Sequence, residues 1–98
     1  MTIEIKRNTE STTVELCGRL DTTTAPALDK TLNDDLKDVN NLVLDFKELE
    51  YVSSAGLRVL LAAQKRLKNS GEMKLINVSE EVMEVFEMTG FSDILTIV

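Results

Sequence analysis

Two adjacent serines, Ser53 and Ser54, stand where an apolar stretch gives way to a helical pattern. A hydroxyl at a helix N-terminus can accept a hydrogen bond from an unpaired backbone N–H and so cap the helix. The same position tolerates a phosphate, because the first N–H groups and the helix dipole favour negative charge there. Spacing alone favours a cap, and phosphoryl acceptance is the alternative that would give the pair a function.

The residues after the serines, Ala55 and Gly56, add almost no side-chain bulk. The active site of a partner could therefore approach the backbone closely at this point. In a helix interior, Gly is about 1 kcal/mol less favourable than Ala in helix propensity. The presence of Gly56 therefore points to a constraint that excludes a larger side chain. Either close approach of a partner or close packing of the helix on a sheet would supply it.

Residues 21–24, Asp-Thr-Thr-Thr, form a second polar cluster, and Pro26 follows where a first helical turn accommodates proline. A helix-capping turn is the plain interpretation of this cluster. Asp45 is a third candidate, as a phosphoacceptor at the end of a central strand like that of a response-regulator receiver. Such a receiver needs an acidic pair after its first strand and binds Mg²⁺, whereas the first strand here ends in Lys6-Arg7. We therefore expect an ordinary strand-end Asp and no metal site.

The composition excludes several kinds of site. The chain has 98 residues, a formal net charge of −6, no His and a single Cys, Cys17. The negative charge argues against direct nucleic-acid binding and against docking on anionic membranes. Without His there is no Ser-His or Cys-His nucleophile pair. We expect a protein that is not an enzyme and needs no cofactor, with Cys17 packed as a small apolar side chain.

The charge is uneven along the chain. Residues 55–70 contain four cations and no acids: Arg58, Lys65, Arg66 and Lys68. A solvated helix face is the usual meaning of such a run, and a complementary surface for an acidic partner is the alternative.

Apolar periodicity predicts the element order β-β-α-β-α-β-α-β. The predicted strands cover residues 2–7, 12–21, 42–46, 73–77 and 94–98, and Gly18 ends or bends the second. The predicted helices cover residues 24–36, 54–67 and 79–90, the second ending at Asn69-Ser70-Gly71 and the third burying Val82, Val85, Phe86 and either Met88 or Thr89. Residues 47–52 are expected to be a short connection. Strands alternating with helices indicate an α/β domain over residues 1–98, with a mixed, mostly parallel sheet flanked by helices.

The chain carries no apolar run near the ~18–20 residues that a membrane-spanning helix needs. Its first residues alternate like a strand and lack the apolar core of a signal peptide. We expect a cytoplasmic protein that does not associate with membranes and is monomeric when free.

Several segments together resemble the STAS domain, and most of all the bacterial anti-sigma factor antagonists. The resemblance rests on Asp45-Phe46 followed by residues 51–57, Tyr-Val-Ser-Ser-Ala-Gly-Leu, and on Gly18-Arg19-Leu20-Asp21 with Thr24-Ala25. Residues 75–78, Leu-Ile-Asn-Val, and residues 89–91, Thr-Gly-Phe, fit the same family, so the resemblance covers essentially the whole chain.

The resemblance implies a sheet with helices on one side and a phosphorylated serine at the start of the second helix. In the family pattern an Asp precedes that serine and a second hydroxyl residue follows it. Here Ser53 stands in place of the Asp and Ala55 in place of the second hydroxyl residue. The resemblance therefore implies Ser54 as the phosphoacceptor, with Ser53 as the alternative.

The resemblance also implies a function. Unphosphorylated, the protein would bind an anti-sigma factor that is also a GHKL-type serine kinase and so free a sigma factor; a PP2C-type phosphatase would reset it. The loop with Asp21 would lie near the phosphoserine and contact the kinase. The predicted partner-binding residues are Asp21, Thr22, Thr23, Ser53, Ala55, Gly56, Leu57 and Arg58.

Two alternatives follow from the wider family: an interaction module in another phospho-signalling or scaffolding complex, and a transporter-associated regulatory domain. We expect the transporter alternative not to apply, because the chain has no membrane segment and starts at Met1.

Overall fold

Alternating apolar and polar residues form the first two strands, β1 (Thr2–Arg7) and β2 (Thr12–Leu20), which pair antiparallel. In the turn between them, the side-chain oxygen of Asn8 accepts hydrogen bonds from the amides of Glu10 and Ser11. An Asn that bonds its own downstream backbone in this way stabilises a tight turn. The computed structural model describes residues 1–69 and 71–98.

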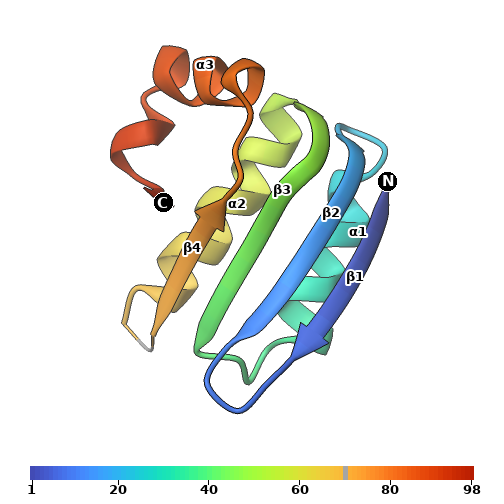
Figure 1. The fold of residues 1–98 in the computed structure, drawn as a ribbon, viewed down its shortest axis with the longest axis vertical. Coiled ribbons are helices and arrows are strands. Elements are labelled where there is room, and N and C mark those ends of the chain that lie inside the picture. Colours follow the sequence, from blue (N-terminus) through green and yellow to red (C-terminus); the bar gives the residue numbers. More distant parts are fainter. Residues whose placement is uncertain (70) are drawn as a thin grey trace.

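The remaining strands, β3 (Asn41–Val52), β4 (Glu72–Ile76) and β5 (Thr96–Ile97), extend the sheet in parallel, in the order β1-β2-β3-β4-β5. The helices are α1 (Ala25–Lys30), α2 (Ser54–Leu67) and α3 (Glu80–Thr89). Figure 1 shows α1 and α2 behind the sheet, which turns its other face to the viewer. The predicted fold class, an α/β domain with a mixed, mostly parallel sheet flanked by helices, is confirmed.

The core lies between the sheet and the helices. Alternate residues of β2 and β3 are fully buried there, including Val14, Leu16, Leu44 and Phe46. The matching helical stripe on α2 is buried at Gly56, Leu57, Leu60, Ala63 and Leu67. Burial of apolar area on this scale is the main force that holds each helix on the sheet.

The predicted connection over residues 47–52 is wrong, because β3 continues without a break to Val52. Its second half pairs with the end of β2, Leu49 with Gly18 and Val52 with Leu20, across two register shifts. Gly18 has a φ of 104°, a backbone conformation that only Gly adopts at low cost, and it bends the strand as predicted. The shifts place buried residues of β3 three apart, at Phe46, Leu49 and Val52, so the alternation that marks a strand is lost.

The predicted helix over residues 24–36 is only partly α-helical. After α1 ends at Lys30, the chain continues as a π-helical turn, η1 (Thr31–Asp35), closed by a bond from the amide of Leu36 to the carbonyl of Thr31. Leu28, Leu32 and Leu36 are nevertheless all buried, as their spacing predicts.

Two predictions of burial are wrong. Cys17 is exposed, because in β2 it falls on the face of the sheet away from the helices. Met88 is 87% exposed and Thr89 is exposed too, because α3 buries only the side that carries Val82 and Phe86. Gly90, in a left-handed conformation, ends α3 and leads into the 3₁₀ turn η2 (Phe91–Asp93).

The end of α2 agrees with the predicted range, residues 54–67. The helix ends at Leu67, and of the segment expected to end it, Ser70 lies outside the described residues. Within the described part of the chain, no helix is long and apolar enough to cross a membrane.

Candidate functional site

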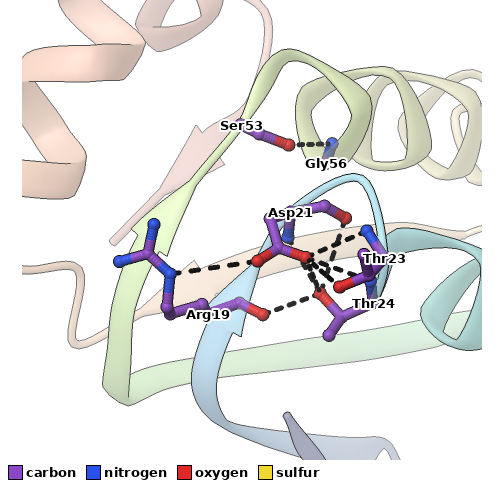
Figure 2. Close-up of polar contacts among 6 residues, drawn as sticks. All are labelled: Arg19, Asp21, Thr23, Thr24, Ser53 and Gly56. Atoms are coloured by element: carbon purple, nitrogen blue, oxygen red, sulfur yellow. Dashed lines mark hydrogen bonds and ion pairs between the residues drawn. The ribbon is translucent and has the colours of Figure 1, made fainter.

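The loop between β2 and α1 is built around the carboxylate of Asp21. Its Oδ1 accepts hydrogen bonds from the Thr23 amide at 3.0 Å, the Thr23 hydroxyl at 2.8 Å and the Thr24 amide at 3.2 Å (Figure 2). The Thr24 hydroxyl accepts from the Asp21 amide at 2.8 Å and donates to the carbonyl of Arg19 at 2.7 Å. These bonds form a polar turn that leads into α1, but the predicted helix cap is wrong, because the N-cap residue Thr24 makes no side-chain cap hydrogen bond. The turn fixes the direction in which Asp21 and its neighbours point.

These bonds set the electrostatics of the loop. The hydroxyl of Thr23 is the largest cause that holds the pKa of Asp21 below its usual range, and the amides of Thr23 and Thr24 add to it. Donors aimed at a carboxylate favour its charged form, so Asp21 is ionised at neutral pH. The second carboxylate oxygen, Oδ2, lies 3.8 Å from Nε of Arg19.

At the start of α2 the two serines have different roles. Ser53 is the N-cap residue, with its Oγ accepting a hydrogen bond of 3.3 Å from the amide of Gly56 (Figure 2). Ser54 is the first residue of the helix and is exposed. The cap and the exposed hydroxyl therefore belong to different side chains.

The Asp21 loop and the serines come together because β2 and β3 end side by side. The amide of Ser53 donates to the carbonyl of Leu20 at 2.8 Å, one residue before Asp21. Figure 2 shows Ser53 and Asp21 on neighbouring segments at the same end of the sheet. The carboxyl ends of parallel strands are where sites of α/β proteins gather.

Gly56 is explained by packing. A Cβ atom at this position would lie 2.7 Å from Cγ of Leu20 and 3.2 Å from the Leu20 carbonyl oxygen. Of the two reasons that the sequence allows for Gly56, the structure supplies close packing on the sheet. Leu57 is only 6% exposed. The contact of Gly56 and Leu57 with a partner stays a prediction. Their observed packing holds the first turn of α2, and with it Ser54, on the sheet.

A shallow groove of about 390 Å³ lies between α1 and α2, and its lining includes Ala55, the residue that follows Ser54. Its floor and walls are largely apolar, with one anion and one cation at the rim. The lining residues are Thr22, Ala25, Pro26 and Asp29 on the α1 side, and Ala55, Arg58 and Val59 on the α2 side. The groove thus joins three of the predicted partner-binding residues, Thr22, Ala55 and Arg58, which are far apart in sequence.

Sequence reasoning missed the pairing of Arg19 with Tyr51. The shifted register of β2 and β3 sets these residues side by side, and the guanidinium carbon of Arg19 lies 4.2 Å from the centre of the Tyr51 ring. A cation over an aromatic face is attracted to it. Either residue alone is unremarkable in the sequence, so only the bulged register reveals the pair.

Asp45 does not lie at a strand end, so that prediction is wrong: β3 continues for seven residues beyond it. Its Oδ1 accepts hydrogen bonds from the Lys47 amide and from Nδ2 of Asn77, both at 3.0 Å. These bonds tie the loop after β4 to β3. The described residues contain no group of three or more His, Cys, Asp or Glu side chains that could hold a metal ion.

The four cations of the predicted basic run lie in three different surroundings. Arg66 is half-buried and donates to the carbonyls of Leu32 in η1, at 3.0 Å, and of Lys37 after it, at 3.2 Å. Lys65 and Lys68 are exposed at the far end of α2, about 16 Å and about 21 Å from Ser54 along the helix axis. Arg58 is the member of the set that borders the groove.

Comparison with known proteins agrees with this arrangement. The family model described as the STAS domain matches residues 2–98. A relative from Listeria monocytogenes, named anti-sigma-B factor antagonist, is 35% identical over 100 residues, covering 99% of this chain and 88% of that protein.

Solved structures share the fold. An anti-sigma factor antagonist from Mycobacterium paratuberculosis has a TM-score of 0.86 at 24% identity, over 98% of this chain and 83% of that chain. The Bacillus cell-fate determinant SpoIIAA, solved in its phosphorylated form, has a TM-score of 0.75 at 20% identity, over 99% of this chain and 91% of that one. At these identities the likeness concerns the fold.

Proposed function

This chain belongs to the STAS domain family, and from that premise we propose that it is an anti-sigma factor antagonist switched by phosphorylation of Ser54. The Listeria relative carries the name of such an antagonist. SpoIIAA, which shares the fold, exists in a phosphorylated form. Unphosphorylated, the protein would bind an anti-sigma factor and release the sigma factor held by it.

The choice of Ser54 rests on the different positions of the two serines in the structure. Ser53 caps α2 through its Oγ, whereas Ser54 is exposed at the first helical position. In Ser53 the Oγ that would receive the phosphate is already engaged with the Gly56 amide and the residue is only partly exposed, whereas Ser54 is open to a kinase. A phosphate on Ser54 would also lie near the unpaired amides of the first turn, which favour negative charge.

The chemistry is phosphoryl transfer from ATP. Oγ of Ser54 attacks the γ-phosphorus, a new P–O bond forms, the bond to the β–γ bridging oxygen breaks, and ADP leaves. The hydroxyl proton passes to a base of the kinase, which also holds the nucleotide and Mg²⁺. We propose that this kinase is the anti-sigma factor itself, of GHKL type, as the family resemblance implies. Because the step consumes ATP, we place the switch in the cytoplasm.

The reverse step is hydrolysis. Water attacks the phosphorus of the phosphoserine, inorganic phosphate leaves, and Oγ regains a proton. We propose a PP2C-type phosphatase for this step, again on the resemblance to the family.

The surface proposed for the partner joins the Asp21 loop, the first turn of α2 and the groove between α1 and α2. It offers Asp21, Thr22 and Thr23 from the loop and Ala55 and Arg58 from the helix. Phosphorylation would add about −1.5 to −2 charges to this surface. Together with Asp21 and Asp29, the phosphate would make this surface more anionic, so the interface would be opposed by repulsion from acidic groups of the partner and by the cost of desolvating the phosphate.

The test is phosphorylation by the cognate kinase with ATP, mapped by mass spectrometry in wild type, Ser54→Ala and Ser53→Ala. We expect label on Ser54, none in Ser54→Ala, and continued labelling in Ser53→Ala. Phosphate found on Ser53 alone would overturn the assignment.

The charge mechanism is tested separately by binding. Ser54→Asp should bind the anti-sigma factor at least tenfold more weakly than Ser54→Asn, a neutral side chain of similar size. Equal affinities would show that charge at this position does not switch the complex. An Asp21→Ala variant should also bind more weakly, and unchanged affinity would remove Asp21 from the proposed surface.

A further inference from the structure

Ser54 and Arg58 lie one turn apart on α2, and both are exposed. Side chains at positions i and i+4 of a helix project from the same face. An anionic residue placed four positions before a cationic one is the favourable orientation for a pair on a helix. As a serine, however, residue 54 offers Arg58 no charge.

The charged groups of the Asp21 loop, Asp21 and Arg19, are already engaged. Oδ1 of Asp21 is held by Thr23 and Thr24, and Arg19 contacts both the Tyr51 ring and Oδ2 of Asp21. The ion pairs among the described residues join Lys6 to Glu15, Arg19 to Asp21 and Lys74 to Glu72, so none of them engages Arg58. Asp29 lines the same groove as Arg58, from the α1 side, and its Oδ1 accepts a hydrogen bond from Nδ2 of Asn33.

We propose that a phosphate on Ser54 pairs within the molecule with Arg58 and draws this guanidinium from the rim of the groove to the first turn of α2. The inference rests on the proposed modification of Ser54 and adds to it a built-in counter-charge. Phosphate oxygens accept two parallel N–H bonds from an arginine, which makes such a pair stronger than one with lysine.

The pair changes the partner surface in two ways at once. The phosphate adds an anion at the start of α2, and the groove loses Arg58, which leaves Asp29 as the charged group at its rim. A partner that offers a carboxylate to Arg58 loses that contact on phosphorylation. The phosphorylated and unphosphorylated surfaces thus differ both in the charge of the phosphate and in the position of Arg58.

The test uses phosphoserine installed at position 54 during protein synthesis, so that no kinase is needed, and follows the phosphate by ³¹P NMR as pH is varied. A nearby cation favours the dianion and lowers the pH of its titration midpoint. We expect Arg58→Gln to raise this midpoint by about 0.2–0.4 relative to wild type. Lys65→Gln, which removes a cation from the far end of the same helix, should leave it unchanged.

Arg58→Lys keeps a cation without the planar guanidinium and should give an intermediate midpoint. Salt screens exposed pairs, so raising the ionic strength should shrink the difference between wild type and Arg58→Gln. An identical midpoint in these two proteins would overturn the proposal, as would an equal shift in Lys65→Gln. Because the phosphate is installed synthetically, the result is independent of whether the kinase modifies Ser54, which the labelling experiment decides.

Discussion

The amide of Ser53 donates a hydrogen bond of 2.8 Å to the carbonyl of Leu20, which joins the end of β3 to the end of β2. Each residue is followed directly by one half of the candidate site, Ser54 on one side and Asp21 on the other. A Cβ on Gly56 would collide with Leu20, so the same residue also sets how closely α2 approaches the sheet. The geometry of the site therefore depends on Leu20, a fully buried side chain with no chemistry of its own.

The two serines should differ in their effect on stability. Ser53→Ala removes the cap of α2 and should lower the free energy of unfolding by about 1 kcal/mol, whereas Ser54→Ala should change it by less than about 0.5 kcal/mol. Urea unfolding measures both. Ser53→Asn, which retains a capping oxygen, should restore most of the loss; equal losses for the two alanine variants would contradict the assignment of the cap.

Gly56→Ala should destabilise the protein by about 1–3 kcal/mol, because the added methyl group overpacks against Leu20. Leu20→Ala removes the side-chain atoms that this methyl group would clash with. In a double-mutant cycle, the two substitutions together should cost less than the sum of the single effects, by about 1 kcal/mol. Additive costs would mean that the helix moves away rather than clashing at this point.

Asp21 should contribute to the loss of stability, measured as the free energy of unfolding, at acidic pH. Its pKa is lowered in the folded protein, chiefly by the Thr23 hydroxyl, so in acid the unfolded chain binds more protons than the folded one. The stabilisation is present above the ordinary Asp pKa, near pH 4, and is lost as pH falls through the lowered value. Asp21→Asn should therefore flatten the decline of the urea midpoint below about pH 4, and an unchanged slope would argue against the loop bonds.

Arg66 should behave as a structural residue, unlike its neighbour Lys65. Arg66→Ala removes charge-assisted bonds to the carbonyls of Leu32 and Lys37 and should cost about 1–3 kcal/mol. Lys65→Ala, an exposed change on the same helix, should stay within about 0.5 kcal/mol. Chemical denaturation of the two variants measures both changes. If Arg66 and Lys65 only formed a solvated basic face, both substitutions would leave the free energy of unfolding nearly unchanged.

The thiol of Cys17 should react in the native state. Because Cys17 is exposed on the sheet face away from the helices, a thiol reagent such as Ellman's should modify one equivalent per chain without denaturant. Cys17→Ser should show no reaction. A thiol that reacts only after unfolding would place Cys17 in the core, where its apolar neighbours in the sequence suggested it would be.

The order of the elements could be predicted from the sequence because each element has its own local signal. The stripe of leucines after Ser54 and the alternation of Val14 and Leu16 follow from helical and strand periods, which need no knowledge of the rest of the chain. The placement of a serine pair at the start of α2, and of the Asp21 loop before α1, followed from the same signals.

What only the tertiary structure decided depends on contacts between distant residues. The register shifts of β2 against β3 extended β3 to Val52 and placed Arg19 on Tyr51. A bulge breaks the period of two, so no local pattern reports it. Likewise the choice of packing for Gly56 required Leu20, and the face of Cys17 required knowing which side of the sheet the helices cover. The sequence by itself determined that a hydroxyl begins α2; the fold decided that Ser53 caps it while Ser54 is exposed, because only backbone geometry sets which side chain meets the amide of Gly56.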